Sequence, residues 1–325
     1  MSEVLVADIG GTNARFALAG GAVDVPRLEE STRVLATADF PSLEDAARHY
    51  LDEVGVRPAR AVFAIAGPVI DDRIRMTNCP WVMSLTDTRR ALALDRLRTV
   101  NDFHAMARSV PLLRAGDLEV LGAPPAPEWG AAPLPDRMCA VMGPGTGLGV
   151  AGLVVRHGRA HALETEGGHV GFAPVDALEI EVLRRLMARF GRVSTERIVC
   201  GSGLVALHRA LDEIEGRPAE DLEPRDVTAR AAGGDAAAVR TVETFCGIFG
   251  SVAGDAALML GAFGGVYLPG GLVPHLLPWL REGRFRARFA AKGRFAEVLE
   301  RTPTVAVLHP QPGLLGLAAI AADAA

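Results

Sequence analysis

Carboxylates and one histidine that could bind a ligand occur at three places in the sequence. Asn101-Asp102 follows the predicted short strand 98–100, Glu166-Gly-Gly-His169 places an acid and an imidazole beside flexible backbone, and Glu196 lies in Ser-Thr-Glu-Arg. Each carboxylate can accept hydrogen bonds from two neighbouring hydroxyls, so this set suits a polyhydroxylated ligand. Structural roles stay open for each: a helix N-cap at 101–102, a polar turn at 166–169 and a first-turn helix acid at Glu196.

A glycine-rich turn near the start of the chain suits a phosphate. An apolar run from Val4 ends on Asp8, the residues Gly10-Gly11-Thr12-Asn13 turn the chain, and a second short apolar run leaves from Ala14. This pattern predicts strand–turn–strand. Glycines let backbone amides approach a ligand closely, and three side chains could add donors, while the acid could hold a hydrated cation. An ordinary hairpin explains the stretch equally well. The three donor side chains are Thr12, Asn13 and Arg15.

A second stretch, 138–155, repeats the same pattern at the head of the second half of the chain. Its turn contains Gly143, Gly145, Thr146 and Gly147. Two such turns at the heads of successive α/β halves indicate a duplicated architecture, and together they could grip the phosphate chain of one nucleotide. Pro269-Gly270-Gly271, after another apolar run, is a third turn that exposes backbone.

Apolar runs and helical spacings alternate along the rest of the chain and predict an α/β protein. Ser42 with Asp45 predicts the start of a helix that continues to Gly55, and Ser84 with Asp87 predicts another to about residue 94. The proline-rich stretch 122–135 predicts a surface loop near a domain junction. We expect further strands at 31–37, 60–66, 98–100, 265–268 and 304–308, and further helices at 103–110, 176–190, 203–214, 236–260 and 314–322.

Composition excludes several classes of function. The 325 residues are 49% hydrophobic and 22% charged with a net charge of −5, so neither nucleic acid nor an anionic membrane is an expected partner. Lys292 is the only lysine among 34 basic residues, and its surroundings suit neither a Walker loop nor a Schiff base. The four cysteines form no metal or disulfide pattern, and the N-terminus shows no targeting signal, so we expect a cytoplasmic protein.

Two glycine patterns resemble dinucleotide-binding fingerprints. Gly147-Leu-Gly-Val-Ala-Gly152 is followed by a β-branched run where a helix is required. Gly201-Ser-Gly203 does precede a predicted helix, but the second strand and acid of a Rossmann unit would fall in the loop-like stretch 215–224. Neither pattern meets the requirements of a dinucleotide-binding unit, which argues against an oxidoreductase.

Taken together, the motifs resemble the bacterial glucokinases of the hexokinase/actin-like ATPase superfamily. The matches occur in the family's order along nearly the whole chain, and no cysteine-rich zinc motif follows His169, so the resemblance is to the zinc-free branch. Gly171 and Thr165 depart from the residues common in the family, which puts loop conformation in doubt. The matching stretches are 8–15, 76–81, 101–103, 143–149, 166–170, 194–197, 264–266, 269–271 and 312–316.

The resemblance implies a role for each of these sites. Asp102 would be the general base for the sugar 6-hydroxyl, and Asn101, Glu166, His169 and Glu196 would bind the other hydroxyls. Asp8 would hold Mg²⁺ through water. The phosphates of ATP would lie on the two hairpins and the adenosine near the third turn, with these residues involved: Asp8, Gly10, Gly11, Thr12, Asn13, Arg15, Gly143, Gly145, Thr146, Gly147, Gly270 and Gly271.

The resemblance also implies an architecture and an activity. The fold would be the two-domain actin-like ATPase (ribonuclease H-like) fold with a central cleft, with residues 1–112 plus the C-terminal helix 312–325 as a small domain and 113–311 as a large one. The protein would be a homodimer that transfers the γ-phosphoryl group of ATP to glucose, the first step of glycolysis. The rival from another class is a non-catalytic sugar sensor or repressor, which predicts an added DNA-binding arm and tolerates loss of the base.

Overall fold

The structure, a computed structural model, has two compact units. It describes residues 3–20, 22–65, 67, 69–75, 81–122, 124–125, 127–129, 133–218 and 220–323. Unit 1 combines residues 1–113 with 310–325, and unit 2 contains residues 114–309. The predicted motif at 76–81 lies, apart from Trp81, outside the described residues.

Unit 1 is built on a five-stranded sheet in the order β3-β2-β1-β4-β8. The first three strands form an antiparallel meander, and β4 and β8 then run parallel to β1. A small antiparallel sheet, β5-β6-β7, is formed by the chain between β4 and β8. The strands are β1 Val4–Ile9, β2 Asn13–Ala19, β3 Arg33–Ala36, β4 Arg60–Ile65, β5 Val69–Ile70, β6 Arg73–Arg75, β7 Val82–Ser84 and β8 Arg96–Val100.

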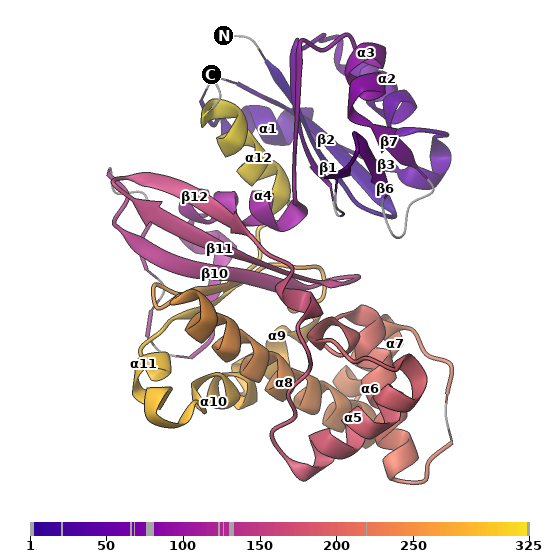
Figure 1. The fold of residues 1–325 in the computed structure, drawn as a ribbon, viewed down its shortest axis with the longest axis vertical. Coiled ribbons are helices and arrows are strands. Elements are labelled where there is room, and N and C mark those ends of the chain that lie inside the picture. Colours follow the sequence, from indigo (N-terminus) through magenta and orange to yellow (C-terminus); the bar gives the residue numbers. More distant parts are fainter. Residues whose placement is uncertain are drawn as a thin grey trace. The chain divides into compact units, whose positions relative to one another are not determined.

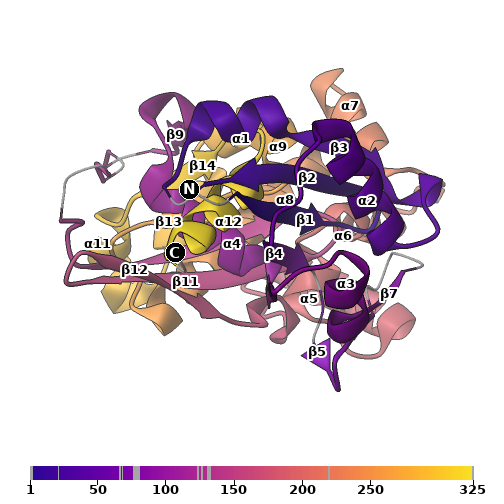
Figure 2. The ribbon, with the colours of Figure 1, turned by 90° about the horizontal axis from the view of Figure 1, so that it is seen from above.

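Helices lie on both sides of this sheet (Figure 1). The C-terminal helix α12 packs on β1, β2 and β4 and lies beside α4, as Figure 2 also shows. The contact between α12 and α4 is close, because a Cβ at Gly316 would overlap the carbonyl oxygen of Ala105. Leu5, Phe16 and Phe63 belong to the buried core of this unit. The helices are α1 Val25–Ser31, α2 Leu43–Val54, α3 Leu85–Ala91, α4 Asp102–Ser109 and α12 Pro312–Asp323.

Unit 2 is built on a six-stranded sheet in the order β12-β11-β10-β13-β14-β9. Its first three strands again form an antiparallel meander, β13 and β14 run parallel to β10, and β9 closes the far edge antiparallel to β14. The strands are β9 Leu118–Val120, β10 Arg137–Pro144, β11 Leu148–Arg156, β12 Arg159–Glu164, β13 Val266–Leu268 and β14 Thr304–Val307.

The long helix α8 is the centre of the helical layer of unit 2 (Figure 1). It packs closely on α10, because a Cβ at Gly250 or Gly254 would overlap a carbonyl oxygen of that helix. By length and composition α8 could cross a membrane, but 78% of its most apolar window is buried inside the protein, as expected of a core helix. The helices are α5 Ala177–Phe190, α6 Gly201–Ile214, α7 Pro224–Ala232, α8 Ala236–Leu260, α9 Val273–Arg281, α10 Arg284–Ala290 and α11 Ala296–Glu300.

The two sheets confirm the predicted duplication. Read from the meander edge, β3-β2-β1-β4-β8 and β12-β11-β10-β13-β14 have the same order and the same relative strand directions. Each glycine turn joins the first two strands of its sheet. The predicted α/β class is therefore correct, and the repeated hairpin was the sequence signal for the repeated sheet.

Helix α1 and strand β12 are among the elements that were not predicted, and one predicted helix is shorter than expected. Helix α1 has only seven residues, too few for a helical period, although Asp24 caps it and a proline lies in its first turn. Strand β12 is a polar edge strand with mostly exposed side chains, so it lacks the apolar pattern of a strand. Helix α3 ends at Ala91 and not near residue 94.

Candidate functional site

The first glycine hairpin lies at the edge of the unit 1 sheet where β1 ends. A bond from the backbone N–H of Gly10 to the carbonyl oxygen of Asn13, 3.0 Å long, closes the turn. Both the N–H and the hydroxyl of Thr37 bond to carbonyl oxygens of the turn, at Thr12 and Gly11. Thr12 itself is exposed at the tip. Hydrogen bonds from Thr37 to the carbonyl oxygens of the turn thus hold its conformation.

Asp8 and Arg15 are directly opposite each other on this hairpin. Their side chains lie 3.8 Å apart, and the Asp8 side chain is only 16% exposed. Burial raises the pKa of Asp8 above its usual value, and the nearby Arg15 guanidinium partly opposes that rise. The Asp8 carboxylate also borders Gly313 in the first turn of α12. Burial disfavours the ionised form of Asp8, and a cation bound beside the carboxylate would stabilise that form.

Asn101 and Asp102 follow β8 and begin α4. The side-chain oxygen of Asn101 accepts a bond from the N–H of Phe103 at 2.8 Å, so Asn101 is the N-cap of α4. An oxygen of Asp102 accepts from the same N–H at 2.9 Å. The cap and a ligand-binding role are compatible, because a carboxylate has a second oxygen and each residue is only partly buried.

The sheet of unit 1 brings the Asp8 hairpin and Asp102 to one edge. β1, β4 and β8 are parallel, with Asp8 in register with Ala64 and Ala64 with Val100. The strand ends are therefore two strand spacings, about 10 Å, apart. The carboxyl ends of parallel strands are where open α/β sheets bind ligands.

The second hairpin and the third glycine turn touch each other in unit 2. The carbonyl oxygen of Pro144 accepts a bond from the N–H of Leu272, and a Cβ at Gly143 would overlap the carbonyl oxygen of Pro269. Gly270 has a φ of +121°, which a side chain would strain. Thr146 is exposed at the tip, as is Gly271 in its own turn. The structure thus brings together the predicted phosphate and adenosine segments of this unit.

The three predicted sugar ligands of unit 2 form one cluster beside that hairpin. Nε2 of His169 lies 3.8 Å from a carboxylate oxygen of Glu166, and its Nδ1 lies 4.0 Å from Oε1 of Glu196. The side chains of Glu166 and His169 are 73% and 59% exposed, so they are open to a ligand. Glu196 lies in the 3₁₀ turn Thr195–Arg197 and accepts a bond from the N–H of Leu148 in the hairpin.

Known proteins are similar in sequence to this chain along nearly its whole length. The family model described as glucokinase matches residues 5–324. The chain belongs to the glucokinase family. A glucokinase of Stenotrophomonas maltophilia (strain K279a) is 53% identical over 322 residues, covering 99% of this chain and 95% of that protein.

Solved structures share the fold. The crystal structure of a glucokinase from an Antarctic psychrotroph has a TM-score of 0.85 and 36% identity, with 99% of each chain covered. A ROK family glucokinase from Streptomyces griseus, solved in complex with glucose and AMPPNP, has a TM-score of 0.63 and 20% identity, covering 99% of this chain and 98% of that one. The fold is the actin-like ATPase fold of the sugar kinases, and the protein is an enzyme of the hexose phosphotransferase class.

Three side chains that sequence patterns did not single out as functional hold the turn that carries Glu166 and His169. The hydroxyl of Thr165 bonds to the carbonyl oxygen of Val150 at 2.7 Å and also accepts from the N–H of Gly167. Arg192 donates to the carbonyl oxygen of His169 at 2.7 Å, and the buried Thr195 hydroxyl donates to that of Gly168 at 2.7 Å. These bonds fix the glycine turn on which His169 sits. Hydroxyls and a guanidinium that bond to backbone carry no sequence signal of their own.

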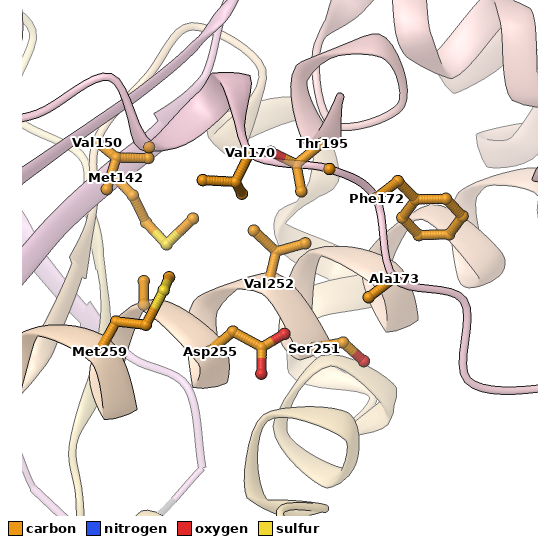
Figure 3. A pocket seen from close by; sticks show the side chains of 13 residues that line it. Met142, Val150, Val170, Phe172, Ala173, Thr195, Ser251, Val252, Asp255 and Met259 are labelled. Carbon is orange, nitrogen blue, oxygen red and sulfur yellow. The ribbon is translucent and has the colours of Figure 1, made fainter. Parts of the chain in front are cut away.

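A cavity of about 60 Å³ lies behind this turn in unit 2. Figure 3 shows Met142, Val150, Val170, Val252 and Met259 around it, with Ser251 and Asp255 along one side. A hexose needs a polar group at each hydroxyl, so this largely apolar cavity does not suit the acceptor sugar. The remaining lining residues are Gly167, Gly171, Phe172, Ala173, Thr195 and Ala256.

Several alternatives to a glucokinase-family site find no support. Gly201 begins α6 directly after a 3₁₀ turn and not after a strand, so no Rossmann unit is present there. Among the residues that the structure describes, no group of three or more His, Cys, Asp or Glu side chains could hold a metal ion. Lys292 bonds to Asp255 and to the carbonyl oxygen of Ser251. Burial raises the pKa of the Cys139 thiol to about 12, which argues against a nucleophilic role.

Proposed function

We propose that this chain transfers the γ-phosphoryl group of ATP to the 6-hydroxyl of D-glucose, giving glucose 6-phosphate and ADP in the first step of glycolysis. The observation that carries the proposal is the cluster of Glu166, His169 and Glu196 directly beside the hairpin 143–149. Groups suited to sugar hydroxyls and backbone suited to phosphates are neighbours there, as phosphoryl transfer between them requires.

The acceptor sugar is proposed to bind through five side chains. Carboxylates accept from hydroxyls, and an imidazole or an amide can both accept and donate, so such a set can match the alternating groups of a hexose. The exposure of Glu166 and His169 supports a ligand role, since most of each side chain is open to solvent. The five residues are Asn101, Asp102, Glu166, His169 and Glu196.

Asp102 is proposed to act as the general base. A sugar hydroxyl is a poor nucleophile, and a positioned carboxylate that accepts its proton contributes about 10²–10⁴-fold to the rate. Its place at the start of α4, after a parallel strand, supports this role, because the backbone N–H of Phe103 fixes one carboxylate oxygen at 2.9 Å. The other oxygen would take the proton.

The phosphate chain of ATP is proposed to lie on the two glycine hairpins. Backbone N–H groups and the exposed threonines at the two tips would neutralise charge that shifts during transfer. Gly270 and Gly271 would lie near the adenosine. The hairpin residues are Asp8, Gly10, Gly11, Thr12, Asn13, Arg15, Gly143, Gly145, Thr146 and Gly147.

Mg²⁺ is proposed as the metal, near Asp8. A single, mostly buried carboxylate with a raised pKa fits an ion that usually keeps several waters and takes one or two carboxylates plus substrate phosphates. Bound there, Mg²⁺ would supply positive charge to the phosphate oxygens.

The remaining family expectations are also proposals. We propose a cytoplasmic homodimer with residues 1–112 plus 312–325 as the small domain and 113–311 as the large one. Light scattering of the purified protein at several concentrations tests the dimer: a mass near 34.2 kDa throughout would contradict it, and twice that mass would agree.

A coupled assay with ATP and Mg²⁺ over several hexoses tests the function, comparing the wild type with Asp102→Asn. Asparagine keeps an oxygen for the N–H of Phe103, so α4 keeps its start while the base is lost. We expect kcat with glucose to fall about 10²–10⁴-fold with little change in KM. Asp45→Asn is the matched control, because Asp45 also lies in the first turn of a unit 1 helix and has no proposed role in binding or catalysis.

Two results would contradict the proposal in different ways. Wild-type turnover by Asp102→Asn would exclude this residue as the base. No turnover of any hexose by the wild type would favour the non-catalytic sugar sensor.

A further inference from the structure

Glu196 faces two parts of the proposed active site at once. Its Oε2 accepts a bond from the N–H of Leu148 at 2.9 Å, within the second hairpin. Its Oε1 lies 4.0 Å from Nδ1 of His169, on the side of the proposed sugar ligands. The side chain is 31% exposed, so the second oxygen can still be reached by a ligand. One carboxylate therefore links the phosphate hairpin to the sugar cluster.

The backbone around Glu196 is fixed on both sides. The N–H of Thr195 bonds to the carbonyl oxygen of Val170 at 2.9 Å, and its hydroxyl bonds to that of Gly168. Farther along, the N–H of Gly201 bonds to the carbonyl oxygen of Gly145 at 2.9 Å. The segment 195–201 thus spans from the sugar turn to the phosphate hairpin, and the Glu196 carboxylate is the part of it that can move at low cost.

Gly147 makes room for this carboxylate. A Cβ at Gly147 would overlap Oε2 of Glu196, whereas a Cβ at Gly145 in the same turn would meet no atom within 4 Å. Neither glycine has a positive φ, so backbone strain does not explain either residue. The glycine at 147 is needed because the acid lies against it.

We infer that Glu196 is a positioning residue for the phosphate donor as well as a sugar ligand. Oε2 holds the N–H of Leu148 and with it the shape of the hairpin, while Oε1 accepts from a sugar hydroxyl. Binding of sugar and nucleotide is then thermodynamically coupled through this one side chain, and the coupling is reciprocal. The inference rests on the proposed function, since it assumes that Glu196 contacts the sugar.

Glucose binding without any nucleotide, measured by calorimetry, tests the link. Gly147→Ala changes the phosphate hairpin but should displace the Glu196 carboxylate, which is the end of a flexible side chain and can move without unfolding the protein. We expect it to weaken glucose binding about tenfold, the effect of losing one hydrogen bond to a charged group. Gly145→Ala is the matched control and should bind glucose within about twofold of the wild type.

A second comparison measures the coupling itself. The affinity for AMPPNP with Mg²⁺ is determined with and without saturating glucose in the wild type, in Glu196→Gln and in Glu166→Gln. We expect Glu196→Gln to lose most of the wild-type change in AMPPNP affinity. Glu166→Gln should bind glucose more weakly yet keep that change, because the Glu166 carboxylate lies beside His169, whereas the N–H of Leu148 bonds to Glu196.

The outcomes separate failure of this inference from failure of the proposed function. If Gly147→Ala binds glucose like Gly145→Ala and Glu196→Gln keeps the wild-type coupling, the inference is wrong, while weakened glucose binding by Glu166→Gln leaves the proposed sugar site standing. If Glu166→Gln and Glu196→Gln both bind glucose like the wild type, the sugar site itself is wrong.

Discussion

The two glycine hairpins have the same place in two similar sheets but different side chains at matching positions. Next to the turn, Ile9 pairs with Ala14 in the first hairpin and Pro144 with Leu148 in the second. One register position farther from the turn, the first hairpin has Asp8 opposite Arg15, and the second has Gly143 opposite Gly149.

The difference shows how one backbone frame serves two purposes. In unit 1 the side chains of Asp8 and Arg15 fill the space beside the end of β1, so the acid belongs to the hairpin itself. In unit 2 the backbone of the 269–271 turn occupies that space, and an acid reaches the hairpin from outside, through Glu196. We therefore expect the first hairpin to supply charge and the second to supply close backbone contacts.

Removing the acid of the first hairpin should have the largest effect. Asp8→Asn is expected to lower kcat/KM about 10²–10³-fold, the usual cost of losing one group that stabilises developing charge. Steady-state assays with ATP and Mg²⁺ measure this effect. Asp52→Asn, an exposed acid of α2, is the control and should retain full activity. Full activity of Asp8→Asn would mean that the charged pair does not distinguish the hairpins.

Adding a side chain to the second hairpin should reduce stability. Gly143→Ala puts a Cβ into the backbone of Pro269, where no flexible side chain can yield, and we expect a loss of about 3 kcal/mol in the free energy of unfolding. Urea denaturation gives this value. Gly145→Ala, which meets open space in the same turn, should change it little, and equal losses at both positions would contradict the account.

A smaller effect should appear in the pH dependence of stability. The folded-state pKa of Asp8 is raised by burial, so ionised Asp8 destabilises the fold at neutral pH, and the penalty disappears as the pH falls below the unfolded pKa of about 4. In EDTA, Asp8→Asn should therefore melt at a higher temperature than the wild type at pH 7, with the difference shrinking towards pH 3. A lower melting temperature at pH 7 would argue that the Asp8–Arg15 attraction outweighs burial.

Local sequence patterns predicted the elements that carry the site but not the contacts between them. Glycines between two apolar runs predicted both hairpins, and Ser42 and Ser84 cap their helices as expected. The bond between Leu148 and Glu196 joins residues 48 positions apart. No periodicity records such a contact, because it depends on how the turns of one sheet edge come together in three dimensions.

The resemblance to a family pointed to the site residues, whereas the residues alone left structural roles open. Asn101 illustrates why: it does cap α4, so the structural explanation is correct whether or not the residue also binds sugar. The fixing bonds of Arg192 and Thr165 were not foreseen, since they involve backbone carbonyls that the sequence does not distinguish.

The most direct test of the central claim is the identity of the products. Phosphorus-31 NMR of the protein with ATP, Mg²⁺ and glucose should show glucose 6-phosphate and ADP appearing in equal amounts. ATP hydrolysis to inorganic phosphate without a sugar phosphate, or a phosphate on another hydroxyl, would contradict the account.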